Sequence, residues 1–342
     1  MTTRSVLVVG AGKRVPETAL PAFERARGQF EVVAIAARSA RELSCAGRSW
    51  RVRPLAELAS GDLTGVELVY CAVAKPAVPA VLAALLERGA ERAALLVDTP
   101  VLPLEHVGRR RLLARFRAAW AAEDCAELPW IELARVAATE IGALREVTFE
   151  RSAYAYHGHA TAKALFAPAR LLSASRRPRG AKAARRVLGF DGGRRASLIE
   201  PRDYTSGALL IAGERGALAD RETPGAARIE LVLRGGRLAG LAAAGARVAL
   251  DDDEIALAHG EAGWPAEASL TARHEGLKRV GFLRLLRRIA AGAGAYPVEE
   301  ALEDSIADRL LHKLGFWRPA LGLGSPAGRL ALGAAARMLG GS

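Results

Sequence analysis

Two histidines and two tyrosines gather in one short segment near the middle of the chain. Tyr154, Tyr156, His157 and His159 lie within six residues, at the start of a predicted helix. Imidazole titrates near neutral pH, so either histidine could exchange a proton with a substrate, aided by Tyr156. A structural turn is one alternative. A His-x-His metal pair is another, but the sequence offers no convincing third ligand. We therefore expect substrate contact and no metal.

A lysine is the second candidate for proton transfer. Lysine occurs only six times in the chain, which otherwise uses arginine for positive charge. Lys75 follows an apolar strand predicted over residues 66–73. A lysine at a strand exit can serve as a titratable amine, and the alternative interpretation is a solvated loop residue.

The start of the chain predicts the scaffold that these side chains need. Consecutive apolar residues at 6–9 indicate a strand buried on both faces, and Gly10 and Gly12 follow it. Glycine lets the backbone approach a ligand, and the N-terminus of the helix predicted over 17–27 favours a phosphate. This is most of a dinucleotide-binding fingerprint, although Val15 stands where a third glycine would fall. We expect a bound nucleotide rather than a purely structural turn.

The end of the second strand, predicted over 30–37, bears on the choice of cofactor. An acidic residue there would bind the 2′-hydroxyl of the adenosine ribose and repel a 2′-phosphate. Here Ala37 is followed by Arg38 and Ser39, so we expect NADP(H) rather than NAD(H); a surface arginine is the alternative. The residues expected to contact the cofactor lie in the glycine turn and at three strand ends: Gly10, Gly12, Lys13, Arg14, Arg38, Ser39, Ala72, Val73, Asp98, Thr99 and Pro100.

Strands alternate with helices through the first part of the chain, which predicts a doubly wound parallel sheet with right-handed crossovers. A short helix beginning at 41–45 is part of this pattern. The remainder is rich in strands, with hairpin signals at residues 192–193 and 235–236, and predicts an α+β domain with a large, open, mainly antiparallel sheet. A further helical piece is predicted over 330–339.

The chain resembles the family of glucose–fructose oxidoreductase and inositol dehydrogenase (Gfo/Idh/MocA). Four motifs carry the resemblance, and their order and spacing match the whole N-terminal domain: G-A-G with P-A-F at 10–23, an Ala-Val strand exit with a V-x-x-x-L helix at 72–85, x-x-Pro at 98–100, and A-E-D at 122–124. The family usually has Glu-Lys-Pro where this chain has Asp98, Thr99 and Pro100. Its lysine assists proton transfer beside the nicotinamide, and threonine cannot do so. Lys75 is the proposed substitute.

The resemblance also implies a site in the second domain. The family has a Gly-x-His segment there, whose histidine is the general acid or base. His159 aligns best by helix register, and His157 is second. Neither Ala162 nor Lys163 supplies the Asp or His that often accompanies this histidine. For residues 204–207 we favour a sheet-edge loop, and the alternative is that they line the cleft; we interpret His274 as a helix-surface residue.

We predict two domains: an NADP(H)-binding Rossmann domain over 1–124 and a substrate-binding and oligomerisation domain over 125–342. The family's C-terminal sheet often mediates oligomers, so we expect a homo-oligomer, either a dimer or a tetramer, formed through it.

Composition narrows the remaining function classes. The 342 residues are 51% hydrophobic and 25% charged, which is ordinary for a soluble globular protein. No apolar run reaches the roughly 18 residues of a membrane span, and no signal peptide is evident, so we expect a cytoplasmic protein without a membrane partner. The net charge of +12 is spread widely. The densest basic segment, 176–186, lacks aromatic residues for base stacking, so we expect anionic small ligands rather than nucleic acid.

These observations predict an NAD(P)H-dependent oxidoreductase. It would transfer hydride to or from a hydroxyl or carbonyl carbon of a small polar substrate, such as a sugar or a sugar nucleotide. Two alternatives remain. One is a reductase of an imine or a conjugated double bond, which needs no family lysine. The other is a nucleotide-binding protein that has lost catalysis and serves as a sensor or partner.

Overall fold

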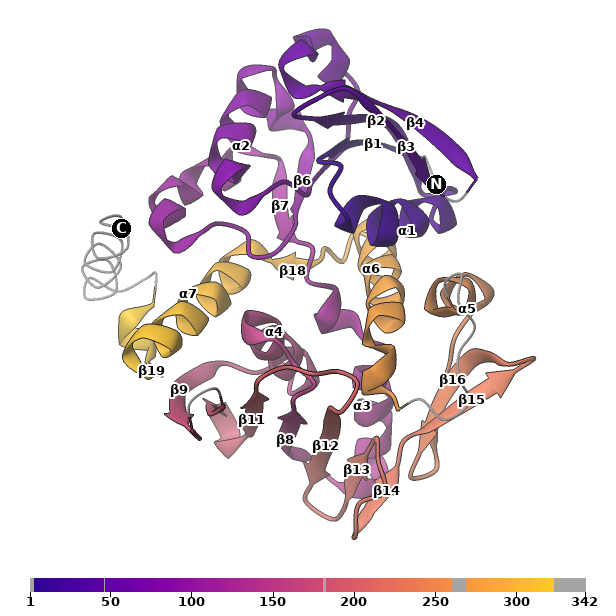
Figure 1. Ribbon diagram of the computed structural model, residues 1–342, viewed down its shortest axis with the longest axis vertical. Coiled ribbons are helices and arrows are strands. Elements are labelled where there is room, and N and C mark those ends of the chain that lie inside the picture. Colours follow the sequence, from indigo (N-terminus) through magenta and orange to yellow (C-terminus); the bar gives the residue numbers. More distant parts are fainter. Residues whose placement is uncertain (1–2, 46, 181–182, 260–268, 323–342) are drawn as a thin grey trace. The chain divides into compact units, whose positions relative to one another are not determined.

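The computed structural model describes residues 3–45, 47–180, 183–259 and 269–322 (Figure 1). The chain forms two compact units. Within the described residues, the first unit comprises the segment up to Glu123 together with Phe282–Ser305, and the second comprises 124–281 together with 306–322. The domain boundary predicted from the sequence placed the segment 282–305 in the second domain instead. The helix predicted over 330–339 lies outside the described residues.

The first unit is organised around one sheet. Its strands are β1 (Arg4–Val9), β2 (Phe30–Ala37), β3 (Arg41–Cys45), β4 (Arg48–Pro54), β5 (Leu68–Cys71), β6 (Ala94–Val97), β7 (Ala118–Ala121) and β18 (Tyr296–Pro297). They lie in the order β18-β7-β6-β5-β1-β2-β4-β3, with the six strands from β7 to β4 parallel. β3 and β18 join the two edges antiparallel. The predicted Rossmann-type parallel sheet is confirmed.

The strand order reverses between β1 and β5. From this pair, the chain passes through α1 (Leu20–Arg25) to β2 in one direction and through α2 (Val78–Glu87) to β6 in the other. Right-handed crossovers that run in opposite directions place their helices on opposite faces of a sheet. The carboxyl ends of β1 and β5 therefore form the position at which open α/β sheets bind ligands.

The helix predicted to begin at 41–45 is wrong. These residues form β3, which pairs antiparallel with β4 from Arg41 opposite Val52 to Cys45 opposite Arg48. A five-residue helix has little stability of its own, whereas an edge strand gains ladder hydrogen bonds from its neighbour. The Cys45 thiol also donates to the carbonyl oxygen of Pro16 at 3.2 Å, which anchors β3 beside the start of the chain.

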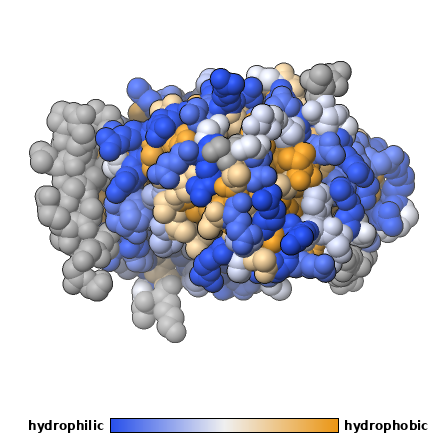
Figure 2. Space-filling view, turned by 90° about the horizontal axis from the view of Figure 1, so that it is seen from above, coloured by the Kyte–Doolittle hydropathy of each residue, from blue (hydrophilic) through white to orange (hydrophobic). Residues whose placement is uncertain are grey.

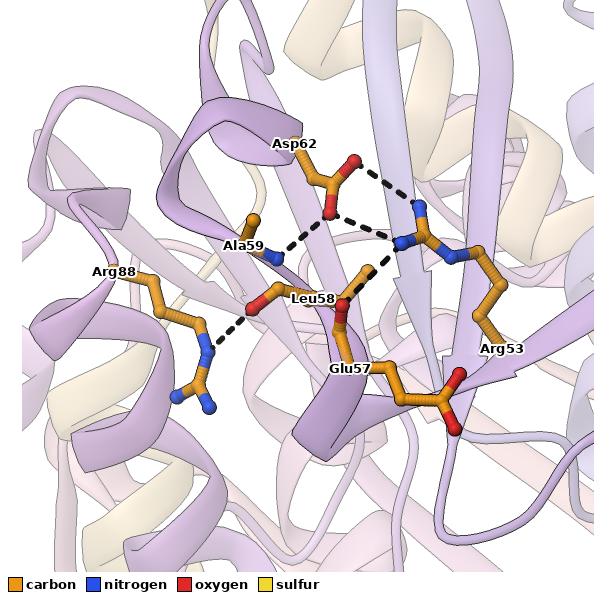
Figure 3. A network of polar contacts seen from close by, with 6 residues as sticks. All are labelled: Arg53, Glu57, Leu58, Ala59, Asp62 and Arg88. Carbon is orange, nitrogen blue, oxygen red and sulfur yellow. Dashed lines mark hydrogen bonds and ion pairs between the residues drawn. The ribbon is translucent and has the colours of Figure 1, made fainter.

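A polar network fixes the connection that follows β4 (Figure 3). Arg53 donates to both carboxylate oxygens of Asp62 at 3.0 and 3.2 Å, and Asp62 accepts the backbone N–H of Ala59 at 2.7 Å. The Arg53 guanidinium and this backbone donor lower the pKa of Asp62. Arg88, at the end of α2, donates to the Leu58 carbonyl at 2.8 Å. The loop before β5 is therefore attached to both a strand end and a helix end.

The second unit contains a larger, mixed sheet. Its strands are β8 (Leu144–Glu150), β9 (Leu171–Pro178), β10 (Ala184–Phe190), β11 (Arg195–Glu200), β12 (Ala208–Gly213), β13 (Ala217–Ala219), β14 (Ala226–Arg228) and β19 (Phe316–Trp317), in the order β14-β13-β12-β8-β11-β10-β9-β19. Five of the seven neighbouring pairs are antiparallel, and β8–β11 and β13–β14 are parallel. The predicted mainly antiparallel sheet is confirmed.

The remaining α-helices all follow β7 in the sequence. α3 (Pro129–Ile141) and α4 (Ala155–Leu165) belong to the second unit, together with α5 (Asp252–His259). α6 (His274–Ala290) and α7 (Val298–Leu314) follow. A separate antiparallel sheet of β15 (Glu230–Arg234), β16 (Arg237–Ala243) and β17 (Ala246–Ala249) packs against α3 and α5.

Glycines make the two predicted hairpins of the second unit. Gly192 and Gly193 connect β10 to β11, and Gly235 and Gly236 connect β15 to β16; all four have positive φ. Such turns place successive strands antiparallel, as the sequence signals indicated.

The surface visible in Figure 2 carries many hydrophilic residues, as expected for a chain in which 25% of the residues are charged. On the face shown in Figure 2, hydrophilic residues separate small groups of hydrophobic ones. Within the described segments, no helix has the length and apolar character needed to cross a membrane.

Candidate functional site

The first candidate region is the turn after β1, where Gly10 is required by the fold. Its φ is +119°, and its N–H donates to the Ala36 carbonyl at the end of β2 at 2.7 Å. A Cβ at this position would overlap the backbone carbonyl of Ala72, just after β5. Gly10 therefore allows the ends of three neighbouring strands to converge.

Gly12 differs, because nothing within the described protein explains its lack of a side chain. It is exposed, and a Cβ built there would have no described atom within 4 Å. Its carbonyl accepts the N–H of Val15 at 2.9 Å, and Val15 is fully buried where the fingerprint has its third glycine. The chain continues through one π-helical turn, Val15–Ala19, into α1. The space over Gly12 is open to a ligand at the sheet edge where the strand order reverses.

Two predicted cofactor contacts, Arg14 and Asp98, meet the predicted catalytic residue Lys75 beside this turn. Asp98, after β6, lies between two cations: Arg14 Nε is 3.3 Å from its Oδ1, and Lys75 Nζ is 3.3 Å from its Oδ2. The guanidinium of Arg14 also lies over the ring of Phe282, 5.4 Å from its centroid. Lys75 is thus an ion-paired residue and not a solvated loop lysine. Thr99, which stands where the resemblance led us to expect a lysine, is only 7% exposed.

The end of β2 carries the residues predicted to select the cofactor. Arg38 and Ser39 are both exposed in the bend after β2, and Lys13 is exposed in the glycine turn. Arg41 adds a contact that sequence reasoning missed, because its guanidinium donates to the carbonyl of Ala11. Its assignment to a helix concealed that contact. As an edge strand beside the turn, β3 brings another cation to this region.

A pocket lies in the second unit, between the start of α4, the start of α6 and the sheet. Its apolar wall is formed by Leu128, Trp130, Phe149, Leu209 and Leu270. Its principal polar groups are Cys125, Ser152, Tyr154, His157, Tyr204 and His274. Ser152, Tyr154 and His157 are close in sequence, but Cys125, Tyr204 and His274 are distant from them, so only the fold shows that all six share a cavity.

His157 is the predicted acid–base residue that lines this pocket. It is half-buried, and its ring lies 4.3 Å from that of Tyr156, centroid to centroid. The Thr161 hydroxyl donates to the His157 carbonyl at 2.7 Å, one helical turn along α4. This arrangement supports the backbone and leaves the imidazole to face the cavity.

His274 and Tyr204 form the opposite polar group. Their rings are stacked with centroids 4.2 Å apart, and Cys125 Sγ is 3.9 Å from His274 Nε2. Burial, reinforced by Lys278, lowers the pKa of His274 to about 3 despite the opposing charge of Asp124. The sequence interpretation of His274 as a surface residue, and of 204–207 as a mere sheet-edge loop, is therefore corrected.

His159 lies elsewhere, although the sequence alignment favoured it over His157. It is 0% exposed, does not line the pocket, and neither ring nitrogen has a hydrogen-bond partner among the described residues. Burial, followed by the charges of Arg186 and Lys163, lowers its pKa well below the ordinary value. Residues two apart on a helix point in different directions, which explains the separation. Between the two histidines, a Cβ on Gly158 would overlap Leu198, so Gly158 allows α4 to pack closely against β11.

Because His157 lines the pocket and His159 does not, the two histidines do not form a His-x-His metal pair. Cys125 could ligate a metal together with His157, because its Sγ lies within 4.8 Å of a His157 ring nitrogen; the same Sγ lies 3.9 Å from His274 Nε2. Thiolate and imidazole are typical zinc ligands. Sequence reasoning did not find these contacts because Cys125 and His274 lie 149 residues apart.

Comparisons with known proteins establish the fold. A myo-inositol dehydrogenase from Corynebacterium glutamicum is 14% identical, with a TM-score of 0.59 over 93% of this chain and 99% of that one. An oxidoreductase from Agrobacterium radiobacter, solved with NAD+, L-tartaric acid and magnesium, is also 14% identical, with a TM-score of 0.59 over 93% and 98%.

An oxidoreductase from Sinorhizobium meliloti is 13% identical, with a TM-score of 0.60 over 93% and 100%. No protein-family model and no curated protein sequence matches the chain. The chain therefore has the two-part fold of these oxidoreductases, with a Rossmann-type sheet followed by a mostly antiparallel one.

Proposed function

We propose that this protein is a nicotinamide-dinucleotide-dependent oxidoreductase that prefers NADP(H). The observation that carries the proposal is the open backbone at Gly12, at the carboxyl edge where the strand order reverses. A pyrophosphate can approach the backbone there, and α/β sheets of this kind bind dinucleotides at this position. The oxidoreductases that share the fold support a nicotinamide dinucleotide as the cofactor, and one of them was solved with NAD+.

The preference for NADP(H) is supported by charge at the end of β2. Arg38 and Ser39 are exposed after this strand, and Arg41 lies beside the glycine turn. A 2′-phosphate would gain charge-assisted hydrogen bonds from these groups, whereas no carboxylate follows β2 directly to bind a 2′-hydroxyl.

The nicotinamide would supply or receive the hydride at the substrate carbon. His157, in the pocket of the second unit, would take the proton from a substrate hydroxyl during oxidation or return it during reduction. Tyr156 would orient the imidazole through their ring contact. Lys75 and Asp98 would hold the cofactor edge of the first unit through their ion pair.

A second candidate reaction follows from Thr99. It occupies the position of the family's lysine, carries no titratable amine and is nearly buried. An imine or a conjugated double bond can accept hydride without that lysine, so reduction of such a bond is the alternative. The third hypothesis is a protein that binds a nucleotide but catalyses no reaction.

The state of the protein in the cell is part of the proposal. We propose a cytoplasmic homo-oligomer assembled through the large sheet of the second unit, acting on a small-molecule substrate. Size-exclusion chromatography with light scattering checks the assembly, and a monomer at micromolar concentration would contradict it.

The test of function has two parts. Titration of the protein with NADPH and with NADH should give saturable binding of both, tighter for NADPH. Incubation with deuteride-labelled NADPH and a panel of ketones, imines and enones should then yield a deuterated product from one class. Tight NADPH binding with no turnover of any substrate class would favour the non-catalytic protein. Absence of nucleotide binding would refute all three hypotheses.

A further inference from the structure

The glycine turn after β1 is held by a side chain from another strand. Arg41, the first residue of β3, donates from its guanidinium to the backbone carbonyl of Ala11. Arg41 is exposed, and within the described part of the chain it has no ion-pair partner that would draw it elsewhere. The contact therefore joins the turn to the edge strand of the first sheet.

The hairpin of β3 and β4 is attached to the segment after the turn by two further contacts. At the end of β3, the Cys45 thiol donates to the Pro16 carbonyl at 3.2 Å. At the start of β4, Arg48 Nη1 lies 2.6 Å from Glu24 Oε1 of α1. Arg41 thus begins a strand whose other end is also fixed beside the same turn and helix.

Two hydrogen bonds fix the peptide groups on either side of Gly12. Arg41 holds the Ala11 carbonyl in the preceding peptide, and the Val15 N–H donates to the Gly12 carbonyl in the following one at 2.9 Å. Glycine has more backbone freedom than any other residue, and Gly12 has no packing contact that would limit it, because a Cβ there would meet no described atom within 4 Å. These two hydrogen bonds therefore supply the restraint that packing does not.

The contact from Arg41 also decides where the Gly12 N–H points. The peptide between Ala11 and Gly12 is trans, so its C=O and its N–H point in opposite directions. Because the carbonyl faces Arg41, the Gly12 N–H faces away from it, and this N–H has no acceptor among the described residues. A donor that is held in one direction before the ligand arrives binds a phosphate oxygen without the cost of ordering the backbone.

From this arrangement we infer that Arg41 is a positioning residue for the pyrophosphate of the cofactor, acting through the peptide between Ala11 and Gly12 and not only through charge near the 2′-phosphate. The inference rests on the proposed function, because it takes a nicotinamide dinucleotide as the ligand of the turn. NADH isolates this role, since it has the pyrophosphate and lacks the 2′-phosphate. Arg38 should therefore matter for NADPH alone, whereas Arg41 should matter for both nucleotides.

Fluorescence titration with NADH tests the inference. Arg41→Ala should weaken NADH binding by about tenfold, because a hydrogen bond from a charged donor is lost and the turn must then be ordered on binding. The loss should persist at about 0.5 M NaCl, where attraction between exposed charges is largely screened. Arg41→Lys should remain within about threefold of the wild type, since lysine keeps an N–H donor. Arg51→Ala, an exposed arginine on β4, is the matched control and should change nothing.

Thermal melts should show all three variants folded, because both positions are exposed on a sheet edge. Three results would overturn the inference: unchanged NADH binding by Arg41→Ala, a loss that disappears at high salt, or an equal loss in Arg51→Ala. Wild-type protein that binds NADH and NADPH, with Arg41→Ala equally competent, would refute this inference alone. Wild-type protein that binds neither nucleotide would refute the proposed function and the inference with it.

Discussion

The glycine turn of the first unit and the pocket of the second are built in opposite ways. At the turn, Gly10 and Gly12 expose backbone, and the side chains around them are mostly charged. In the pocket, an apolar wall faces His157, Tyr204 and His274, and the lysine and arginine side chains that act on these groups, Lys278 and Arg202, are not part of the lining. A backbone site for a phosphate needs little sequence beyond glycine and helix placement, whereas a side-chain site depends on which distant residues the fold brings together.

The largest effect is expected at the pocket. His157→Ala should lower kcat on the identified substrate by roughly 10²–10⁴-fold, because proton transfer by a positioned imidazole contributes about that much. His159→Leu should leave kcat within a few-fold, since that ring is buried outside the pocket. Steady-state kinetics of both variants decide the question. A large loss in His159→Leu with normal His157→Ala would restore the sequence alignment and reverse the structural assignment.

At the turn, substitution of Gly12 should weaken nucleotide binding, whereas substitution of Gly10 should lower stability. Gly12→Leu should weaken NADPH binding by about tenfold to a hundredfold while the melting temperature stays close to wild type, because the new side chain fills open space. Gly10→Ala should instead lower the melting temperature, since its Cβ overlaps the Ala72 carbonyl. Fluorescence titration and thermal melts measure both. Unchanged NADPH affinity in Gly12→Leu would place the nucleotide elsewhere.

The cofactor preference should respond to the end of β2. Arg38→Ala should weaken NADPH binding by about tenfold with little change for NADH, because a charge-assisted contact to the 2′-phosphate is lost. Arg92→Ala, an exposed arginine that follows a helix in the same unit, is the matched control. Equal losses for both nucleotides, or tighter binding of NADH than NADPH by the wild type, would contradict the preference for NADP(H).

Buried histidines should make stability depend on pH. Burial lowers the pKa of His159 and of His274 in the folded state, whereas an unfolded histidine takes up its proton near pH 6.5. The unfolded state therefore binds more protons below that pH, and the free energy of unfolding should fall as the pH is lowered, by up to about 1.4 kcal/mol per pH unit for each histidine. Urea unfolding between pH 7 and 4 measures this slope. His159→Leu should flatten it, and an unchanged slope would mean that His159 is protonated in the folded protein.

Metal removal is expected to have the smallest effect. Proton transfer by His157 requires a ring nitrogen that is not bound to metal, so dialysis against a chelator should leave turnover unchanged. Elemental analysis should likewise find less than about one zinc per ten chains. Stoichiometric zinc that disappears in Cys125→Ser but persists in Cys45→Ser would instead assign Cys125 to a metal centre.

The two regions also differ in how far the sequence predicted them. The strand and glycines at 6–12 predicted the turn correctly, because a buried strand, a positive-φ glycine and a following helix are local signals. The sequence could not show that Arg41 reaches the turn, since strand pairing with β4 overrides local propensity. The pocket was predicted only through the cluster that contains Tyr154 and His157. Cys125, Tyr204 and His274 carry no motif, and tertiary packing alone unites them.

The position of each histidine on α4 explains why the structure favours His157, whereas the sequence favoured His159. His157 and His159 both adjoin Gly158 in the sequence, and the resemblance ranked His159 first by helix register. The structure separates them because the face of α4 that bears Gly158 packs against Leu198 of β11, while His157 faces the cavity. Knowing which face of a short helix is buried requires the sheet beneath it.

Hydrogen–deuterium exchange with and without NADPH tests the central claim most directly. The account predicts slower exchange on nucleotide addition in peptides that cover residues 10–15 and 37–41, and little change in the control variant Gly12→Leu. Exchange at the glycine turn that is identical with and without saturating NADPH would contradict the assignment of the nucleotide to this sheet edge.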